Sequence, residues 1–171
     1  LDQTDTLFPY SLFKPRGHYT NNEISRRYFQ CMMWLQTASF CREKTTALWR
    51  TIVMAAALNR IPADARQKCL KLDQTLTFLM GAPDNASILE IADFLEKNGL
   101  TEQALAHDES VLRQTDGMLK DVFKTRNRIK PKIQLSCADK INFMPARYMA
   151  DNEILGEMAD PAPNAERAYP K

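Results

Sequence analysis

Histidine and glycine are scarce in this chain of 171 residues, with only two histidines and five glycines. With so few histidines, and with no His-Glu-x-x-His or Cys-x-x-Cys pattern, we expect no metal site and no cofactor. No apolar run reaches the roughly 18 residues of a membrane span, so this piece is expected to contain none. A nucleophile elbow and a glycine-rich phosphate loop are also missing, so we assign no catalytic residue.

The composition that remains is typical of one helical domain. Hydrophobic residues make up 44% and charged residues 26%, and eight methionines with few glycines favour helices over turn-rich β structure. A formal net charge of +2 is too small to imply nucleic-acid binding by itself. The chain begins at Leu1 and ends just after Tyr169-Pro170 without a closing element, so we interpret it as a fragment of a longer or processed polypeptide.

Four cysteines, Cys31, Cys41, Cys69 and Cys137, are spaced too irregularly to suggest a metal cluster. We expect them to be buried free thiols, because free cysteine is among the most buried residue types. A disulfide is the alternative for an exported protein. Four cysteines permit three pairings, and the sequence does not choose among them.

Residues 1–20 predict an extended arm, because Pro9, Pro15 and Gly17 interrupt them and no helical stripe is present. Thr20 followed by Glu23 matches a capping box, which predicts a helix from about residue 21. The apolar stripe of this helix is Ile24, Tyr28, Cys31 and Leu35.

Further apolar periodicities predict helices over about residues 43–59, 62–80, 84–98 and 108–129, with an added turn at 101–106. Residues 52–58 are apolar all round, which indicates a central buried helix. The stripe of the 62–80 helix is Ala65, Cys69, Leu72, Leu76 and Leu79, and Gly81 is expected to end this helix.

Residues 131–150 look irregular, with a short extended piece expected at 132–135, and Asp151 is expected to cap a last helix over 151–159. The predicted fold is all-α: an irregular bundle of about five or six helices with an extended N-terminal arm. We divide this single domain into an arm (1–20), a bundle (21–160) and an irregular tail (161–171).

Two long blocks carry a family resemblance. The first is Phe13-Lys14-Pro15-Arg16-Gly17-His18-Tyr19-Thr20, followed by Arg27-Tyr28-Phe29 and Met32-Met33-Trp34-Leu35, and the second runs from Asn142 to Asp151. In this order they resemble an uncharacterised bacterial family, domain of unknown function 3160. The family has Gln before the Arg-Tyr pair and Pro before the Asp, whereas this chain has Ala146 and Ala150.

The resemblance implies a setting rather than an activity. Members occur in large exported or lipoprotein-like bacterial polypeptides, which implies an extracytoplasmic location, in the periplasm or at the cell surface. No catalytic residue is carried over, because none is established for the family.

The same two blocks hold the candidate ligand-binding residues. Arg16, His18 and Tyr19 lie on a peptide fixed by proline, just before a predicted helix start, where free N–H groups favour an anion. Arg147 and Tyr148 follow a second proline. One hypothesis is that the blocks meet in one anion-accepting pocket; the alternative is that Arg16 pairs with an internal carboxylate and that Arg147 anchors its loop to the bundle.

Two functions are therefore compared. The favoured one is a non-enzymatic binding or assembly module that contacts another protein or the remainder of its own polypeptide. The alternative is an enzyme domain whose site accepts a small anion between residues 16–19 and 147–148. The basic residues from Lys120 to Lys132 are interpreted as a solvated face, so nucleic acid is not an expected partner.

Overall fold

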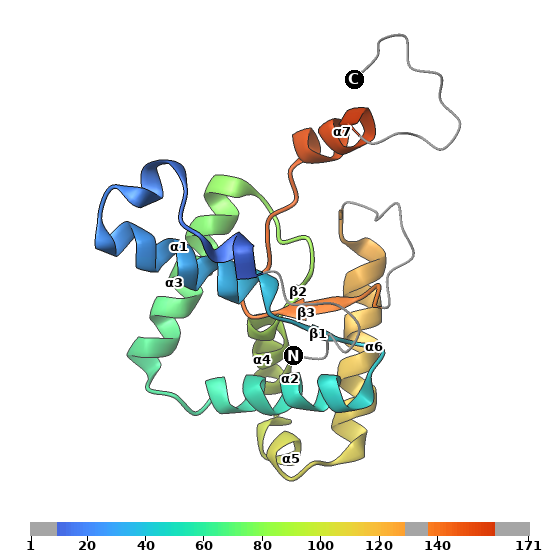
Figure 1. Ribbon diagram of the computed structural model, residues 1–171. Coiled ribbons are helices and arrows are strands. Elements are labelled where there is room, and N and C mark those ends of the chain that lie inside the picture. The colour runs from blue at the N-terminus through green and yellow to red at the C-terminus, as the bar shows by residue number, and fades with distance from the viewer. Residues whose placement is uncertain (1–9, 129–136, 160–171) are drawn as a thin grey trace.

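The fold is predominantly helical with one small sheet, as a computed structural model of the chain shows (Figure 1). The structure describes residues 10–128 and 137–159. The predicted helical bundle is thus confirmed, and a sheet of three strands is added to it. None of the helices in the described ranges is both long and apolar enough to cross a membrane.

The α-helices are α1 (Glu23–Thr37), α2 (Thr45–Leu58), α3 (Ala63–Met80), α4 (Ile88–Lys97), α5 (Thr101–Leu105), α6 (Glu109–Thr125) and α7 (Ala150–Ala159). Two short 3₁₀ helices precede them, η1 (Tyr10–Phe13) and η2 (Gly17–Thr20). The strands are β1 (Ser39–Cys41), β2 (Ala86–Ser87) and β3 (Lys140–Asn142).

The core forms where α2 packs against α4, α5 and α6. Ile52 on α2, Ile91 and Leu95 on α4, and Leu119 on α6 are fully buried there. The apolar run 52–58 therefore belongs to the central helix that its pattern predicts, and the alanines of α2 let its neighbours approach closely.

The sheet joins three distant parts of the chain. Its order is β1-β3-β2, with β3 antiparallel to β1 and parallel to β2. Phe40 and Ala86 both face Ile141 across the ladder, and Ile141 is fully buried. Strands of two or three residues leave almost no alternating pattern, so the sequence gives no sign of them.

The first helix begins later than its capping pattern predicts. Asn22 is the N-cap, and its side-chain oxygen accepts a hydrogen bond from the Ser25 N–H, whereas the Thr20 hydroxyl donates to the Gly17 carbonyl. The arm is also less extended than predicted in the part described, because η1 and η2 fold against α1. Thr20 and Asn22, two residues apart, both suit the cap position, and the contacts of η2 with α1 favour Asn22.

Two other helix starts differ from the prediction. Helix α4 begins after Ser87, whose side chain forms a complete capping box with Glu90, rather than at residue 84. Helix α7 begins at Ala150, which places Asp151 in its first turn instead of at its cap. The predicted extended piece at 132–135 and the tail 161–171 lie outside the described residues.

Candidate functional site

The arm residues predicted to bind an anion, Arg16, His18 and Tyr19, all contact aromatic rings. The guanidinium of Arg16 is 5.4 Å from the ring centroid of Phe29, and Arg16 is exposed with no ion pair among the described residues. His18 contacts the ring of Tyr19, and Tyr19 in turn contacts Phe29. The arm is therefore pinned to α1 through π contacts, and anion binding by Arg16, His18 and Tyr19 stays a prediction.

Arg147 anchors its turn to α3. Its side chain is 2% exposed, with Nη2 2.6 Å from Asp73 Oδ1 and Nη1 3.0 Å from Thr77 Oγ1. Tyr148 donates its hydroxyl to Glu153, and this hydrogen bond raises the pKa of Tyr148 above its ordinary value. Among the described residues, no hydrogen bond, ion pair or ring contact joins this turn to the 16–19 segment.

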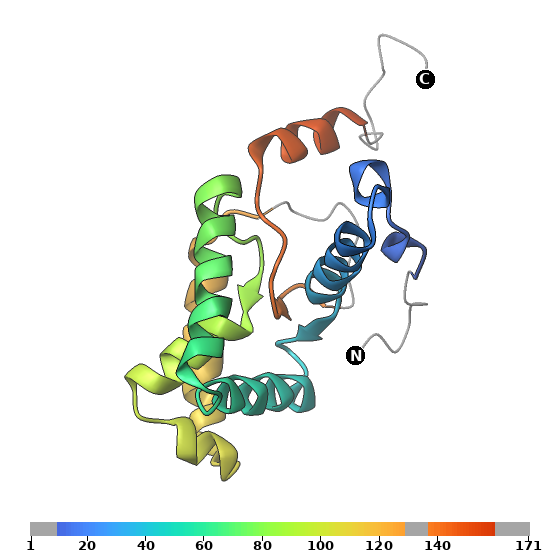
Figure 2. The ribbon, with the colours of Figure 1, turned by 90° about the vertical axis from the view of Figure 1, so that its left-hand side faces the viewer.

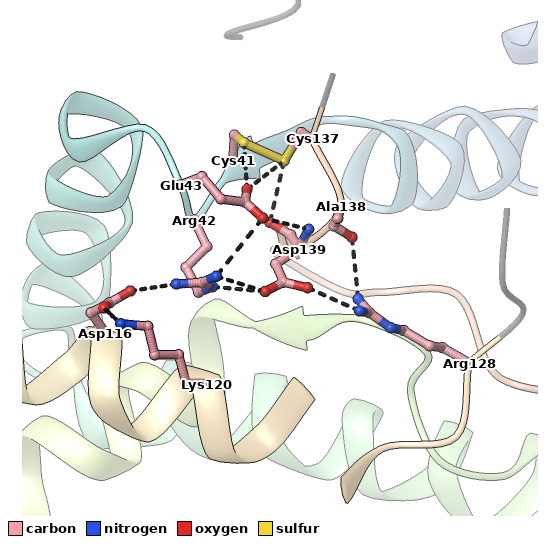
Figure 3. A network of polar contacts seen from close by, with 9 residues as sticks. All are labelled: Cys41, Arg42, Glu43, Asp116, Lys120, Arg128, Cys137, Ala138 and Asp139. Atoms are coloured by element: carbon pink, nitrogen blue, oxygen red, sulfur yellow. Dashed lines mark hydrogen bonds and ion pairs between the residues drawn. A yellow bond between two sulfur atoms is a disulfide. The ribbon is translucent and has the colours of Figure 1, made fainter. Parts of the chain in front are cut away.

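A second polar cluster links β1, α6 and the segment before β3 (Figure 3). We call it the Arg42 network, because the guanidinium of Arg42 lies 2.6 Å from Asp116 Oδ1 and 2.8 Å from Asp139 Oδ2. Its other members extend these two pairs: Lys120 reaches Asp116 at 2.7 Å, and Arg128 reaches Asp139 at 3.0 Å. The network therefore fixes the C-terminal part of the domain to the first strand and to α6.

The charges in this network support one another. Burial opposes the charge on Arg42, but the hydrogen bonds with Asp116 and Asp139 outweigh it, and the pKa of Arg42 lies above its ordinary value. Burial also acts to raise the pKa of Asp116, yet hydrogen bonds from Lys120 and Arg42 hold that pKa below its usual range. Arg42 and Asp116 are therefore both charged at neutral pH.

A disulfide between Cys41 and Cys137 closes one side of the network, across a sequence separation of 96 residues. The favoured prediction of four buried free thiols is therefore wrong. Cys31 is free but exposed, and Cys69 is free and half-buried. The reason is topological: β1 and β3 pair, which brings the ends of two distant segments together with a Cα–Cα distance of 5.8 Å.

Glu43 lies directly against this disulfide. Its Oε2 is 2.9 Å from Cys41 Sγ and 3.2 Å from Cys137 Sγ (Figure 3). Its Oε1 accepts a hydrogen bond from the Asp139 N–H at 3.2 Å and lies 3.8 Å from Arg42. The Asp139 N–H thus fixes Oε1 of the carboxylate, and Oε2 is directed at both sulfurs.

The domain covers the apolar stripe of α3 only in part: Ala65, Cys69 and Leu76 are half-buried. Leu72 is 37% and Leu79 69% exposed, and neighbouring Phe78 is 88% exposed. Polar contacts also attach α3 to the domain: Arg66 donates to Glu96 at 2.8 Å, and Asp73 pairs with Arg147. In Figure 2 α3 and α1 stand apart, and α7 passes above them.

A shallow groove of about 430 Å³ runs between α3 and α4, with apolar side chains along it. The carboxylates at its edge are already engaged: Asp73 with Arg147, Glu90 with Arg126, and Asp93 with Lys97 at 2.7 Å. No free acid, base or nucleophile converges there among the described residues. The groove therefore supports binding better than catalysis.

Ion pairs also occupy the described part of the basic tract. Lys120 pairs with Asp116, Lys124 with Asp121, Arg126 with Glu90, and Arg128 with Asp139. Sequence reasoning missed the Arg42 network altogether. The local signal was Cys41-Arg42-Glu43, but only the pairing of β1 with β3 brings Cys137 and Asp139 to it.

These features define a helical domain with a small mixed sheet, linked by a disulfide and a partly buried ion network. A family model described as "Protein of unknown function (DUF3160)" matches residues 2–171, and the chain belongs to this family. The resemblance stated from the two sequence blocks is thereby confirmed. No curated protein and no solved structure matches the chain.

Proposed function

We propose that this domain is a non-enzymatic binding or assembly module that docks an amphipathic helix of another protein on the apolar stripe of α3. The observation that carries the proposal is the exposed apolar surface on the C-terminal half of α3, where Phe78 lies beside the stripe. Arg66 and Asp73 attach the helix to the domain, and along its apolar stripe Leu72 and Leu79 are exposed, whereas Ala65, Cys69 and Leu76 are half-buried. Exposed apolar surface of this regularity marks an interaction site.

The geometry of the stripe indicates the chemistry of the partner. It contains no charged residue and follows helical spacing over roughly 21 Å of helix axis. Such a surface accepts the side chains of a second helix by ridge-into-groove packing. A flat polar ligand or a nucleic acid would gain nothing from it.

The disulfide supports an extracytoplasmic location, in the periplasm or at the surface of a bacterial cell. Disulfides persist in oxidising compartments and are rare in the cytosol, and Cys41–Cys137 is the kind of long-range link that such compartments permit. This agrees with the exported, lipoprotein-like setting that the family resemblance implies.

Site-specific photo-crosslinking in cells that express the native protein tests the docking surface. A photoreactive residue at Leu72 or Leu79 is expected to give one adduct of discrete added mass. Gln67 and Gln74, roughly opposite on α3, are matched controls that should give none. Equal adducts at all four positions, or none at the stripe, would refute the proposal. An adduct of twice the chain mass would indicate self-association instead.

A further inference from the structure

Glu43 contacts the disulfide, but the disulfide offers no interaction that explains this position. The sulfurs of a disulfide carry no hydrogen, so Glu43 Oε2 gains no hydrogen bond from contacts of 2.9 Å and 3.2 Å with them. Yet the carboxylate of this exposed residue is held against the sulfurs by the Asp139 N–H. Asp139 and Arg42 account for the position of Oε1, whereas the approach of Oε2 to both sulfurs gains a chemical use when the two cysteines are reduced.

We infer that the reduced protein binds Zn²⁺ through Cys41, Glu43 and Cys137. The two Sγ atoms and a carboxylate oxygen lie within 4.8 Å of one another. Thiolate sulfur and carboxylate oxygen are both ligands that Zn²⁺ accepts, at roughly 2.3 Å and 2.0–2.2 Å. Three protein ligands leave a fourth tetrahedral position open to water.

Backbone positions need little adjustment to accept the ion. The Cα atoms of Cys41 and Cys137 are 5.8 Å apart, and breaking the S–S bond lets the sulfurs separate to roughly the distance that two ligands of one tetrahedral Zn²⁺ require. The Asp139 N–H bond to Oε1 serves as the outer contact that orients a ligating carboxylate. Cys41 is buried, and Glu43 and Cys137 reach the surface, which gives the ion a route in.

The charges of the Arg42 network match a dication. In the reduced, deprotonated state the cluster holds five negative groups and three positive ones, which leaves two negative charges. The negative groups are the two thiolates with Glu43, Asp116 and Asp139, and the positive groups are Arg42, Lys120 and Arg128. One Zn²⁺ therefore neutralises the cluster.

The chemistry balances with a dithiol as reductant. The S–S bond accepts two electrons and two protons from the dithiol, which becomes a disulfide itself. On binding, Zn²⁺ displaces one proton from each of the two thiols to solvent and forms bonds to both sulfurs and to one oxygen of Glu43. Disulfide and metal are consequently alternative states of the same two cysteines.

Cobalt titration tests the site. A Cys31→Ser/Cys69→Ser variant, reduced and freed of reductant without air, is titrated with Co²⁺. We expect one equivalent to produce thiolate-to-cobalt charge transfer and the visible bands of tetrahedral Co²⁺, both removed by Zn²⁺. The oxidised variant should show neither band. The absence of charge transfer in the reduced protein would overturn the proposal.

The role of Glu43 is tested separately. Glu43→Gln in the same background should weaken Co²⁺ binding by at least about tenfold, whereas Glu23→Gln, an exposed control, should leave it unchanged. Equal affinity in both variants would remove Glu43 from the site. Thermal melts provide an independent readout: Zn²⁺ should raise the Tm of the reduced protein and not of the oxidised one. If the reduced protein is unfolded and Zn²⁺ fails to refold it, the inference is wrong.

Discussion

At the scale of single residues, Arg42 has the most consequential contacts. Its side chain and that of Asp139 are each only 13% exposed, so solvent only weakly screens the attraction between their opposite charges. The positive charge of Arg42 is tolerated in this position because two carboxylates of opposite charge lie beside it. Removing Arg42 leaves Asp116 with Lys120 alone and Asp139 with Arg128 alone, although both carboxylates stay largely shielded from water.

Arg42→Met should therefore destabilise the domain by about 2 kcal/mol, because it removes the cation that Asp139 and Asp116 share and leaves each with a single, more exposed partner. Urea unfolding followed by circular dichroism measures the change. Arg27→Met is the matched control, since its pair with Glu23 is exposed, and it should remain within about 0.5 kcal/mol of wild type. Similar losses in both variants would contradict the assignment of a buried network.

Asp84 provides a prediction about pH. Burial raises the pKa of its carboxyl above the ordinary value, although Arg126 and Arg147 act to lower it, and its Oδ1 has no hydrogen-bond partner. Because the folded pKa exceeds the unfolded one, its stabilising contribution is complete below the unfolded value of about 3.9 and is lost as the pH rises through the folded value.

Asp84→Asn cannot ionise, so the variant should gain stability relative to wild type as the pH rises from about 4 to 7. The quantity to measure is the difference in unfolding free energy between the two proteins at each pH, in which the other titrating groups cancel. A difference that stays flat or falls over this range would show that Asp84 is not desolvated.

Arg16 permits a direct test of the predicted anion site. If the exposed guanidinium contributes to a site, phosphate or sulfate should raise the Tm of the wild type, and Arg16→Ala should abolish the rise. Arg27→Ala serves as the control for nonspecific effects of salt. An identical shift in all three proteins would remove Arg16 from consideration.

At the scale of elements, the positions of the helices along the chain could be predicted, but which side of each helix is buried could not. Helices α2 and α6 lie close to their predicted ranges, because long apolar periodicity and an Asp108 cap are local signals. On α1, by contrast, the buried side chains are Phe29 and Met32, while Ile24 is 82% exposed. Periodicity identifies a helix, but which apolar side becomes buried depends on neighbours that the local pattern does not contain.

The same distinction applies to the candidate site. The buried arginine of the second block could be noticed from its sequence, as could the alternative that it anchors a loop. The disulfide and the Arg42 network could not, because their members lie about a hundred residues apart and meet only through the β1–β3 pairing.

Helix α6 contains a correctable weakness at Gly117. A Cβ added there meets no atom within 4 Å, so Gly117→Ala should stabilise the protein by about 1 kcal/mol through helix propensity. Thermal unfolding gives the comparison. Gly99→Ala should do the opposite, although its Cβ also has space, because Gly99 has φ +64°. Destabilisation by Gly117→Ala would indicate that α6 has a neighbour at this position.

At the scale of the whole molecule, one covalent bond spans most of the fold. The Cys41–Cys137 disulfide encloses α2 to α6 and β2 within a single loop, which β1 and β3 flank. Such a link acts mainly by restricting the unfolded chain.

Replacing both cysteines by serine should lower the unfolding free energy by about 4 kcal/mol, given the length of the enclosed loop. Urea titrations of the oxidised wild type and the double variant measure it. Cys31→Ser, at a free and exposed thiol, is the control and should have no effect. A double variant as stable as wild type would mean that the remaining contacts already restrict the chain.

The central place of β3 has a consequence for biosynthesis. Both flanking strands bond to β3 and neither bonds to the other, yet β3 is made last. At roughly 5–20 residues per second, β1 leaves the ribosome several seconds or more before the strand that completes its ladder. During that interval the nascent polypeptide can assemble α2, α4, α5 and α6. The hydrogen-bonding edges of β1 and β2 stay unpaired until β3 is made, and they are accessible to chaperones.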